Sequence, residues 1–585
     1  MADQEIMNKA KAYLSQEWNA VFKDEVQKLI EAGDEVELRE RFYRELDFGT
    51  GGLRGELGGG YNRLNSYTTG KAIQGLANYI KAHVGADKQS VVIACDSRNY
   101  SDVFSQTAAE VLAANGIKTY LFTSLRPTPV LSYAVRKLGT CAGIMITASH
   151  NPAKYNGVKV FWEDGAQVTP PHDTGIIGEV NKVTDDIKRI TKEEAVAAGS
   201  IVMIDEEIDG PYNEMCKAQC LRPELVKEKG KDLKIVYTPL HGAGTVPVER
   251  VLSDVGIEVF TVPEQREPDG NFPTVAFPNP EITEAMNLSL KYAKEQGADM
   301  VIGTDPDADR IGIAVPDGDE WTLITGNQLG ALLTDYIFRS RQELDLMPDS
   351  PAFINTIVTT NLQFDIAQAY GATCFKVLTG FKYIGEKIGE WDETEEYQYI
   401  FGGEESYGFL VETDARDKDA VSAALITAEM ALWNVNRGKT VLDHLKEIWQ
   451  TYGYYEEFLI SQYFEGEAGA GIMAGLMKTL REDKPKSWGK LTAASLRDFS
   501  DGSTTNLETG EKVKDIDLPS SNVLQFVMTD GSLVTARPSG TEPKIKFYGS
   551  CCVKPCGDLE EAKSATSALI KSVEACVADL IESVK

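Results

Sequence analysis

Short apolar runs alternate with longer amphipathic stretches along most of the chain. Between residues 91 and 146, the runs VVIA, IKTYLF and AGIMI are separated by the helix-like stretch SDVFSQTAAEVLAANG and by a second helix that begins near Pro129. This order predicts a βαβαβ unit with right-handed crossovers and a largely parallel sheet. Ligands usually bind at the carboxyl ends of such strands, and Ser149 lies just beyond the last one.

The same alternation returns in LKIVYTPLHGAG, IEVFTV and ADMVIGTD (233–305), and again in AFINTIVTT and ATCFKVL (352–378). After TYGYYEEF the pattern changes to short strands in NVLQFVMTDGSLVTARPSG and KIKFYGSC, followed by a helix from about Leu559 to the end. The first fifty residues predict helices. We therefore expect three related mixed α/β domains in series and a C-terminal α+β domain, with limits at 1–205, 206–322, 323–455 and 456–585, which agrees with about 150 residues per domain.

Charge and composition exclude several classes of protein. The chain has 59 Lys and Arg against 89 Asp and Glu, a net charge of −30, which argues against a nucleic-acid partner and means that an anionic substrate needs a local basic cleft. No apolar run approaches the roughly 18 residues of a membrane span, and the N-terminus lacks a signal-peptide core. We expect a cytoplasmic protein with no membrane partner, whose nine cysteines, which lack zinc-site spacing, are reduced thiols.

Three alternating carboxylates follow the apolar strand before GTDPDADRIG (303–312). Asp305, Asp307 and Asp309 would repel one another unless a hard divalent cation bound them. An EF-hand loop is excluded, because Arg310 and Pro316 stand where its Gly and Glu belong. An aspartyl-phosphate nucleophile fits the crowded trio less well than a metal, and a solvated acidic turn is the structural alternative.

Two further motifs place hydroxyl and cationic groups in turns. TASHNPAKYNGVKV (147–160) sets Ser149 beside His150, which first suggests a hydrolase, but the two are adjacent in sequence. TARPSGTEPKIKFYG (535–549) offers a guanidinium, two hydroxyls and a glycine amide, typical of a phosphate site; a polar turn between strands is the alternative. These groups belong to Arg537, Ser539, Gly540 and Thr541.

Two weaker motifs have structural alternatives of equal weight. In GGEESYG (402–408), Glu404 and Ser406 could bind vicinal sugar hydroxyls or form a surface turn. In TGFKYIG (379–385), Lys382 lies between aromatic residues, where desolvation would lower its pKa towards general acid/base use, or it is a surface lysine. Nucleotide-binding loops are not supported, because Trp433 and Arg54 replace the required glycines near NRGKT and in GTGGLRG.

Together and in this order, these motifs resemble the α-D-phosphohexomutase superfamily, and GEESYG with TGFKYIG is similar to its phosphoglucomutase branch. The likeness runs from about Thr50 to Tyr548. It implies four domains around a central cleft, the fourth being a mobile phosphate-binding lid.

The resemblance also implies roles for individual residues. Ser149 would carry the transferred phosphoryl group and bind Mg²⁺ together with Asp305, Asp307 and Asp309. Catalytic roles are implied for Ser149, His150, Lys159, Arg54 and Lys382. Substrate contacts are implied for Arg310, Thr379, Gly380, Glu404, Ser406, Arg416 and Lys418, and phosphate contacts for Arg537, Ser539, Gly540 and Thr541. No role is implied for His241.

The expected activity is therefore that of an isomerase, an intramolecular phosphotransferase that interconverts glucose 1-phosphate and glucose 6-phosphate, with glucose 1,6-bisphosphate as intermediate and activator. Alternatives on the same scaffold are a phosphopentomutase, a phosphomannomutase and a glucose 1,6-bisphosphate synthase. A non-catalytic phosphosugar sensor is the alternative from another class. The expected partner is a phosphorylated sugar, and the expected assembly is a monomer or homodimer.

Overall fold

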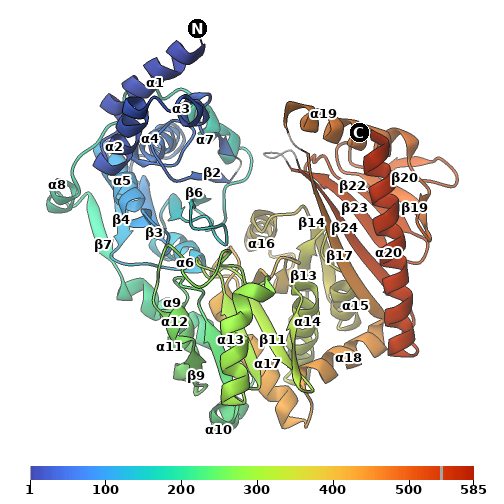
Figure 1. The fold of residues 1–585 in the computed structure, drawn as a ribbon. Helices are drawn as coiled ribbons and strands as arrows, with labels where there is room; N and C mark the ends of the chain where they lie inside the picture. The colour runs from blue at the N-terminus through green and yellow to red at the C-terminus, as the bar shows by residue number, and fades with distance from the viewer. Residues whose placement is uncertain (1, 50, 465, 540–543, 585) are drawn as a thin grey trace. The chain divides into compact units, whose positions relative to one another are not determined.

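The computed structural model describes residues 2–49, 51–464, 466–539 and 544–584 (Figure 1). The chain divides into two compact units. The first comprises residues 1–326 and 381–438, and the second comprises residues 327–380 and 439–585.

Three N-terminal helices form a small layer of their own, as predicted for the first fifty residues. They are α1 (Ala2–Gln16), α2 (Ala20–Ala32) and α3 (Glu35–Phe42). Asn19 caps α2 by accepting a hydrogen bond from the Val21 amide, and Gly33 ends it in the left-handed conformation. Tyr13 and Phe42 pack edge to face in the apolar core that joins these helices to Tyr67.

The first sheet follows, with strands in the order β1-β2-β6-β5-β3-β4-β7. Its strands are β1 (Phe48–Gly49), β2 (Gly52–Glu56), β3 (Ser90–Cys95), β4 (Lys118–Phe122), β5 (Ala142–Ile146), β6 (Tyr155–Trp162) and β7 (Ile201–Ile204). Its helices are α4 (Ser66–His83), α5 (Ser101–Ala114), α6 (Thr128–Leu138), α7 (His172–Val180) and α8 (Lys192–Ala197).

The strand order explains where this sheet can bind a ligand. The strands β5, β3, β4 and β7 are parallel, and the chain crosses from β3 to β4 on one side and then back to β5 on the other. The topological switch point therefore lies between β3 and β5, at the carboxyl ends where ligands bind. The expected parallel arrangement of the run 91–146 is confirmed for β3, β4 and β5. The strands β6, β2 and β1 extend the sheet in antiparallel fashion, because the loop 147–154 between β5 and β6 is too short for a crossover.

The second sheet repeats this arrangement in the order β12-β11-β10-β8-β9. Its strands are β8 (Ile235–Thr238), β9 (Val259–Thr261), β10 (Met300–Thr304), β11 (Ile311–Asp317) and β12 (Glu320–Ile324). Its helices are α9 (Glu206–Ala218), α10 (Pro223–Lys229), the 3₁₀ turn η1 (Gly230–Asp232), α11 (Thr245–Val255), α12 (Pro263–Arg266) and α13 (Thr283–Gln296). Here the switch point lies between β8 and β10, and the three aspartates follow β10.

The first unit is completed by residues that return after position 380. They form α16 (Lys382–Thr394), the antiparallel pair β15 (Gln398–Gly403) and β16 (Phe409–Leu410), and α17 (Ala420–Asn436). Helix α17 is buried along most of its length and packs against α9 and α11.

The second unit contains α14 (Gly326–Glu343), β13 (Pro351–Thr356), α15 (Leu362–Ala369), β14 (Thr373–Val377) and α18 (Val441–Tyr452), with β13 and β14 parallel. The last part is an antiparallel sheet in the order β17-β24-β23-β22-β19-β20-β21, with β18 paired to β19. Helix α20 lies along β17 and β24 (Figure 1). The bounds are β17 (Tyr454–Tyr463), α19 (Gly466–Asp483), β18 (Ser487–Trp488), β19 (Leu491–Asp498), β20 (Ser503–Asn506), β21 (Lys512–Lys514), β22 (Leu524–Met528), β23 (Leu533–Pro538), β24 (Lys544–Val553) and α20 (Leu559–Val584).

The predicted fold class, mixed α/β domains followed by a C-terminal α+β domain, is confirmed. All nine cysteines, which lie in the described part of the chain, are free thiols. Among the described residues, no helix combines the length and the apolar character that crossing a bilayer requires.

Candidate active site

The loop after β5 holds Ser149 in a left-handed backbone conformation, with a φ of 52°. Thr147 fixes this turn, because its Oγ1 accepts a hydrogen bond from the Ser149 amide at 2.8 Å and donates one to Asp96 Oδ2 at 2.6 Å. Asp96 follows β3, so both residues that orient Ser149 come from the switch point of the first sheet. The Ser149 side chain points away from solvent and is 4% exposed.

The loop after β10 gathers the three aspartates. Asp305, Asp307 and Asp309 are buried, and one carboxylate oxygen from each lies within 4.8 Å of the others. Asp305 Oδ1 accepts hydrogen bonds from the amides of Asp309 and Arg310, both at 3.1 Å. These bonds close a tight turn in which Ala308 has a φ of 47°.

The structure brings the two loops together. Ser149 Oγ donates a hydrogen bond to Asp305 Oδ2 at 2.8 Å. Thr128, at the start of α6, donates from Oγ1 to Asp307 Oδ2 at 2.8 Å and from its amide to the Asp307 carbonyl oxygen at 2.9 Å. The nucleophile candidate and the carboxylates are therefore held by backbone and side-chain bonds from both sheets.

The aspartate cluster fits a divalent cation. Asp307 Oδ1 and Asp309 Oδ1 are buried and accept no hydrogen bond from the described residues, which is costly for a carboxylate unless a cation compensates it. Burial raises the pKa of Asp305 well above its usual range, and the carboxylates of Asp307 and Asp309 raise it further. Oxygen-only donors of this kind suit Mg²⁺ or another hard ion.

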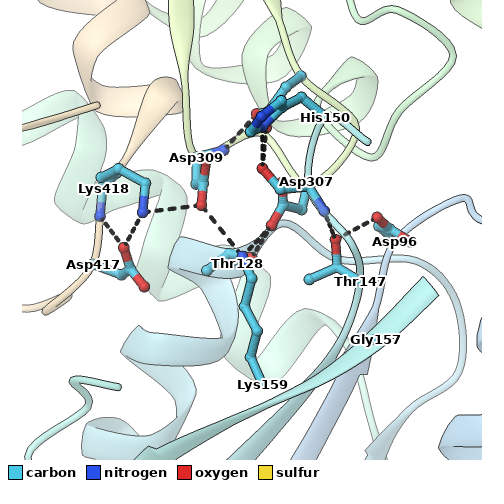
Figure 2. A network of polar contacts seen from close by, with 12 residues as sticks. Asp96, Thr128, Thr147, His150, Gly157, Lys159, Asp307, Asp309, Asp417 and Lys418 are labelled. Carbon is cyan, nitrogen blue, oxygen red and sulfur yellow. Dashed lines mark hydrogen bonds and ion pairs between the residues drawn. The ribbon is translucent and has the colours of Figure 1, made fainter. Parts of the chain in front are cut away.

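Two lysines flank the cluster, the partly buried Lys159 and the buried Lys418 (Figure 2). Lys159 Nζ lies 2.8 Å from Asp307 Oδ2 and 3.5 Å from Asp309 Oδ2. Lys418 Nζ lies 3.1 Å from Asp309 Oδ2 and 2.7 Å from Asp417 Oδ1. Burial alone would lower the pKa of both lysines, but these carboxylates raise it, so both stay charged.

His150 lies beside the serine hydroxyl, with Nδ1 3.0 Å from Ser149 Oγ. Burial, followed by the positive charges of Arg310 and Arg54, holds the pKa of His150 well below its usual range. The imidazole is therefore neutral at pH 7, where it can accept or donate a hydrogen bond at the seryl oxygen.

Two arginines add positive charge at this site. Arg54 is an exposed residue of β2. The glycine at position 52 allows β2 to pack closely against β6, because a Cβ there would lie 1.9 Å from the Val158 carbonyl oxygen. Arg310 Nη1 pairs with Glu281 at 2.7 Å, and its Nε lies 3.8 Å from Asp309 Oδ1.

The predicted sugar-binding pair follows β15. Glu404 is buried and Ser406 is half-buried, and the Glu404 amide donates to the Gly408 carbonyl oxygen at 2.8 Å. Burial raises the pKa of Glu404 to about 7, although the charge of Lys418 opposes the rise.

Lys382 is the first residue of α16. Its Nζ lies 3.5 Å from the Val168 carbonyl oxygen and 3.7 Å from Asp173 Oδ2. Burial lowers the pKa of Lys382, and Asp173 partly offsets this effect, so the direction agrees with the expected desolvation.

Arg416 differs from the other cations of the first unit. Its side chain is fully buried and pairs with Asp392, and its amide donates to Ser132 Oγ at 2.7 Å. This placement favours a structural role, and the implied substrate contact of Arg416 stays a prediction.

The second unit holds the remaining candidates. Thr379 and Gly380 follow β14; Thr379 Oγ1 is buried without a hydrogen-bond partner among the described residues, and Gly380 has a φ of 124°. Arg537 and Ser539, at the end of β23, line a cavity of about 350 Å³ together with Met473, Met477 and Asn522. Gly540 and Thr541 lie outside the described residues.

Sequence reasoning missed the supporting residues Asp96, Thr128, Thr147 and Asp417. Asp96 and Thr147 follow strands, Thr128 begins α6, and Asp417 lies in the segment before α17, inside the stretch DARDKDAV. His241, which had no predicted role, is buried with Nε2 2.8 Å from Thr274 Oγ1 and belongs to the packing of the second sheet.

Comparisons with known proteins agree with this arrangement. Three family models match, the alpha/beta/alpha domains I, II and III of phosphoglucomutase/phosphomannomutase, over residues 45–186, 211–318 and 325–452. The phosphoglucomutase of Staphylococcus epidermidis is 38% identical over 520 residues, covering 88% of this chain and 92% of its own. That of Staphylococcus aureus is 36% identical over 549 residues, covering 94% and 96%.

Solved structures show the same fold. A putative phosphomannomutase from Thermus thermophilus has a TM-score of 0.67 at 21% identity and covers 92% of this chain and 99% of its own. The open form of a Paramecium phosphoglucomutase, parafusin, has a TM-score of 0.67 at 18% identity, covering 92% and 96%. The chain therefore belongs to the phosphoglucomutase/phosphomannomutase family of the α-D-phosphohexomutase superfamily. Within that superfamily it falls in the phosphoglucomutase branch, and it is an isomerase of the phosphotransferase type.

Proposed function

We propose that the protein interconverts glucose 1-phosphate and glucose 6-phosphate through a phosphoserine at Ser149. The observation that carries the proposal is the 2.8 Å hydrogen bond from Ser149 Oγ to Asp305 inside the buried carboxylate cluster. The choice of glucose is supported by relatives named phosphoglucomutase that are 36–38% identical over most of the chain.

Asp305, Asp307 and Asp309 would hold Mg²⁺, with the seryl phosphate as a further ligand. When bound, the ion neutralises charge that develops on the transferred phosphoryl group. The lysines at 159 and 418 orient the carboxylates of Asp307 and Asp309 and keep the local charge balanced.

The transfer begins with a free sugar hydroxyl attacking the phosphorus of phospho-Ser149 in line. The bond between phosphorus and the seryl oxygen breaks, and the hydroxyl proton passes to a base, for which Lys382 is the candidate because burial lowers its pKa. The departing seryl oxygen takes up a proton from solvent and becomes the free hydroxyl of Ser149. His150, 3.0 Å from Oγ, hydrogen-bonds the departing seryl oxygen. The product is glucose 1,6-bisphosphate.

The bisphosphate then returns its other phosphoryl group to Ser149, which regenerates the phosphoenzyme and releases the isomer. Glu404 and Ser406 recognise the sugar hydroxyls, and Arg54 and Arg310 favour the anionic substrate. Arg537, Ser539, Gly540 and Thr541 bind the phosphate that does not react, so that binding energy remote from the reaction orients both half-reactions.

The division into domains at 1–205, 206–322, 323–455 and 456–585, the cytoplasmic location and the monomeric or homodimeric state stay predictions.

Ser149→Ala tests the phosphoserine. We expect turnover to fall by more than about a thousandfold, and a phosphate adduct on the Ser149 peptide of the wild-type protein, measured by mass spectrometry, to disappear. Ser253→Ala, on the exposed side of α11, is the matched control, and it should keep both the turnover and the phosphate adduct of the wild-type protein. Full turnover by Ser149→Ala would show the mechanism to be wrong.

A comparison of three substrates tests the sugar. We expect kcat/KM to be highest for glucose 1-phosphate, lower for mannose 1-phosphate and lowest for ribose 1-phosphate. A preference for ribose would replace the proposal with a phosphopentomutase. No turnover in the presence of Mg²⁺ and a trace of bisphosphate would favour a phosphosugar sensor.

A further inference from the structure

Arg98 is a fully buried arginine at the switch point of the first sheet, and none of the roles discussed above includes it. Its Nη1 donates to the carbonyl oxygens of Pro152 at 3.0 Å and Tyr155 at 2.9 Å. Its Nη2 donates to the carbonyl oxygens of Ser149 and Asn151. One guanidinium group therefore binds four backbone carbonyls of the loop that carries Ser149.

The loop needs such a partner. Ser149 has a positive φ, which a residue other than glycine adopts at an energetic cost and keeps only when its surroundings impose it. The four carbonyl groups turn towards the interior, where unpaired backbone oxygens are unfavourable. A planar guanidinium with five N–H donors can satisfy them all, whereas a lysine ammonium has three donors and no planar geometry.

Arg98 is itself held in place from both sides. Its Nε lies 3.5 Å from Asp96 Oδ2, and its amide donates to Asp96 Oδ1 at 3.0 Å. The ring of Phe272, a buried residue of the segment that precedes α13, lies over the guanidinium with its centroid 5.0 Å from Cζ.

The segment around Phe272 fits closely onto the Arg98 backbone. A Cβ at Gly270 would lie 2.4 Å from the Asn99 amide nitrogen, and Asn99 Nδ2 donates to Asn271 Oδ1 at 3.0 Å. The two α/β domains of the first unit thus enclose Arg98, so that its guanidinium cannot turn away from the Ser149 loop.

We propose that Arg98 is a positioning residue for phosphoryl transfer: by binding the carbonyl oxygens of Ser149, Asn151, Pro152 and Tyr155, it holds the seryl oxygen at the aspartate cluster. This inference rests on the proposed phosphoserine mechanism. Because Arg98 contacts the Ser149 loop only through its backbone carbonyls and, among the described residues, touches none of those proposed to bind the sugar, it acts on the transfer step and not on substrate affinity.

Arg98→Lys is the principal test. Since a misplacement of about 1 Å can cost about 100-fold in rate, we expect kcat to fall about 10- to 100-fold while KM for glucose 1-phosphate stays within about threefold. Hydrogen exchange should accelerate at the amides of Asn151 and Tyr155, which are bonded within the loop, and not in the sheets. All rates are expressed per folded molecule, from the native fraction measured by circular dichroism.

Arg41→Lys is the matched control. Arg41 is also buried and donates to the Gly59 carbonyl oxygen at 3.0 Å and to Glu25 and Glu37, but it lies among the N-terminal helices. This variant should lose stability and keep kcat per folded molecule. Wild-type kcat in Arg98→Lys, or a loss of kcat equal to that in Arg41→Lys, overturns the inference.

A second variant covers the case in which Arg98→Lys does not fold. Phe272→Leu keeps the apolar cover of Arg98 but removes the aromatic face that the guanidinium contacts. The interaction energy of such a contact corresponds to a factor of about two to five, so kcat should fall by that factor while KM stays constant. Unchanged kcat in this folded variant would refute the inference. If the wild-type protein itself lacks phospho-Ser149 and turnover, the proposed function fails instead, and the two failures are thereby distinguished.

Discussion

Glu404 connects burial to substrate recognition at the scale of one residue. The strand β15 ends at Gly403, and Glu404, which follows it, is buried, so that burial raises its pKa to about 7. Because the native state holds this proton more tightly than the unfolded chain, the Glu404 contribution to stability decreases as pH rises from about 4.5 to 7 and is constant above that range. The carboxylate form, which accepts hydrogen bonds from sugar hydroxyls, dominates only above pH 7.

We therefore expect KM for glucose 1-phosphate to fall as pH rises through 7. In Glu404→Gln this pH dependence should vanish, and KM at pH 8 should be about 10- to 100-fold higher than in the wild type, the range for losing a hydrogen bond to a charged group. Steady-state kinetics between pH 6 and 8.5 measure both effects. Glu405→Gln is the neighbouring control, and an unchanged KM profile in Glu404→Gln would contradict the assignment.

The limits of sequence reasoning are also clearest at single residues. The three aspartates were predicted as a metal site because their motif follows an apolar strand and is contiguous in sequence. The same pattern placed Ser149 at a strand end, and the family resemblance supplied its role. Thr128 could not be predicted, because its partner Asp307 is 179 positions away and only folding brings the two sheets together. Arg416 shows the opposite case: its cationic character was recognised, but its burial against Asp392 depends on packing that a local pattern does not contain.

At the scale of elements, hydrophobic alternation predicted the strands and helices of the α/β domains well. It was less informative in the C-terminal domain. Helix α19 contains several glycines, which lower helix propensity, and β19 to β21 carry many polar residues because they lie towards one edge of the sheet. Strand β24, which was expected to be short, is ten residues long, since it pairs with β17 along its whole length.

A buried ionic cluster links two helices of the second unit. Asp335 of α14 is fully buried. Its Oδ2 lies 2.8 Å from His444 Nε2 of α18 and 3.0 Å from Arg339 Nη2. Its Oδ1 accepts a hydrogen bond from the Tyr370 hydroxyl at 3.0 Å. Burial alone would raise the pKa of Asp335, but hydrogen bonds and charge from His444 and Arg339 lower it. Each of these partners would be left unsatisfied if the carboxylate were removed.

Asp335→Asn should therefore destabilise the second unit by about 3 kcal/mol at pH 7, as expected when one partner of a buried pair is removed. Because the native pKa of Asp335 is lowered, its ionic contribution is present above the ordinary pKa of about 4 and is lost as pH falls below it. Urea denaturation at pH 7 and pH 3 should show the difference between variant and wild type shrinking at low pH. Glu482→Gln, which removes an exposed pair with Lys478, should change stability by less than about 1 kcal/mol.

At the scale of the whole molecule, the distribution of charge matters more than its total. The chain carries −30 overall, yet Arg98, Lys159, Arg310 and Lys418 lie within one contiguous site of the first unit and partly neutralise the carboxylates there. An anionic sugar phosphate is repelled by the surface at long range and attracted only near the site. Salt screens both effects, so ionic strength has opposing influences on association.

Because the molecule is large, we expect its folding not to depend on metal binding. The first unit has an extended core from Phe22 to Ile201, and the second has its own core around Leu476 and Phe547, whereas the aspartate cluster occupies one loop. Mg²⁺ in tenfold excess over its dissociation constant would stabilise the native state by about 1.4 kcal/mol, which corresponds to no more than a few degrees in Tm for a unit of this size.

Chelation by EDTA should thus abolish turnover, leave the circular dichroism spectrum at 25 °C unchanged and lower only the melting transition of the first unit, with activity restored by added Mg²⁺. The variant Asp307→Asn should be inactive in the presence of Mg²⁺, and its Tm should not shift when EDTA is added. Unfolding of the wild-type protein by EDTA at 25 °C would mean instead that the ion is a structural part of the fold.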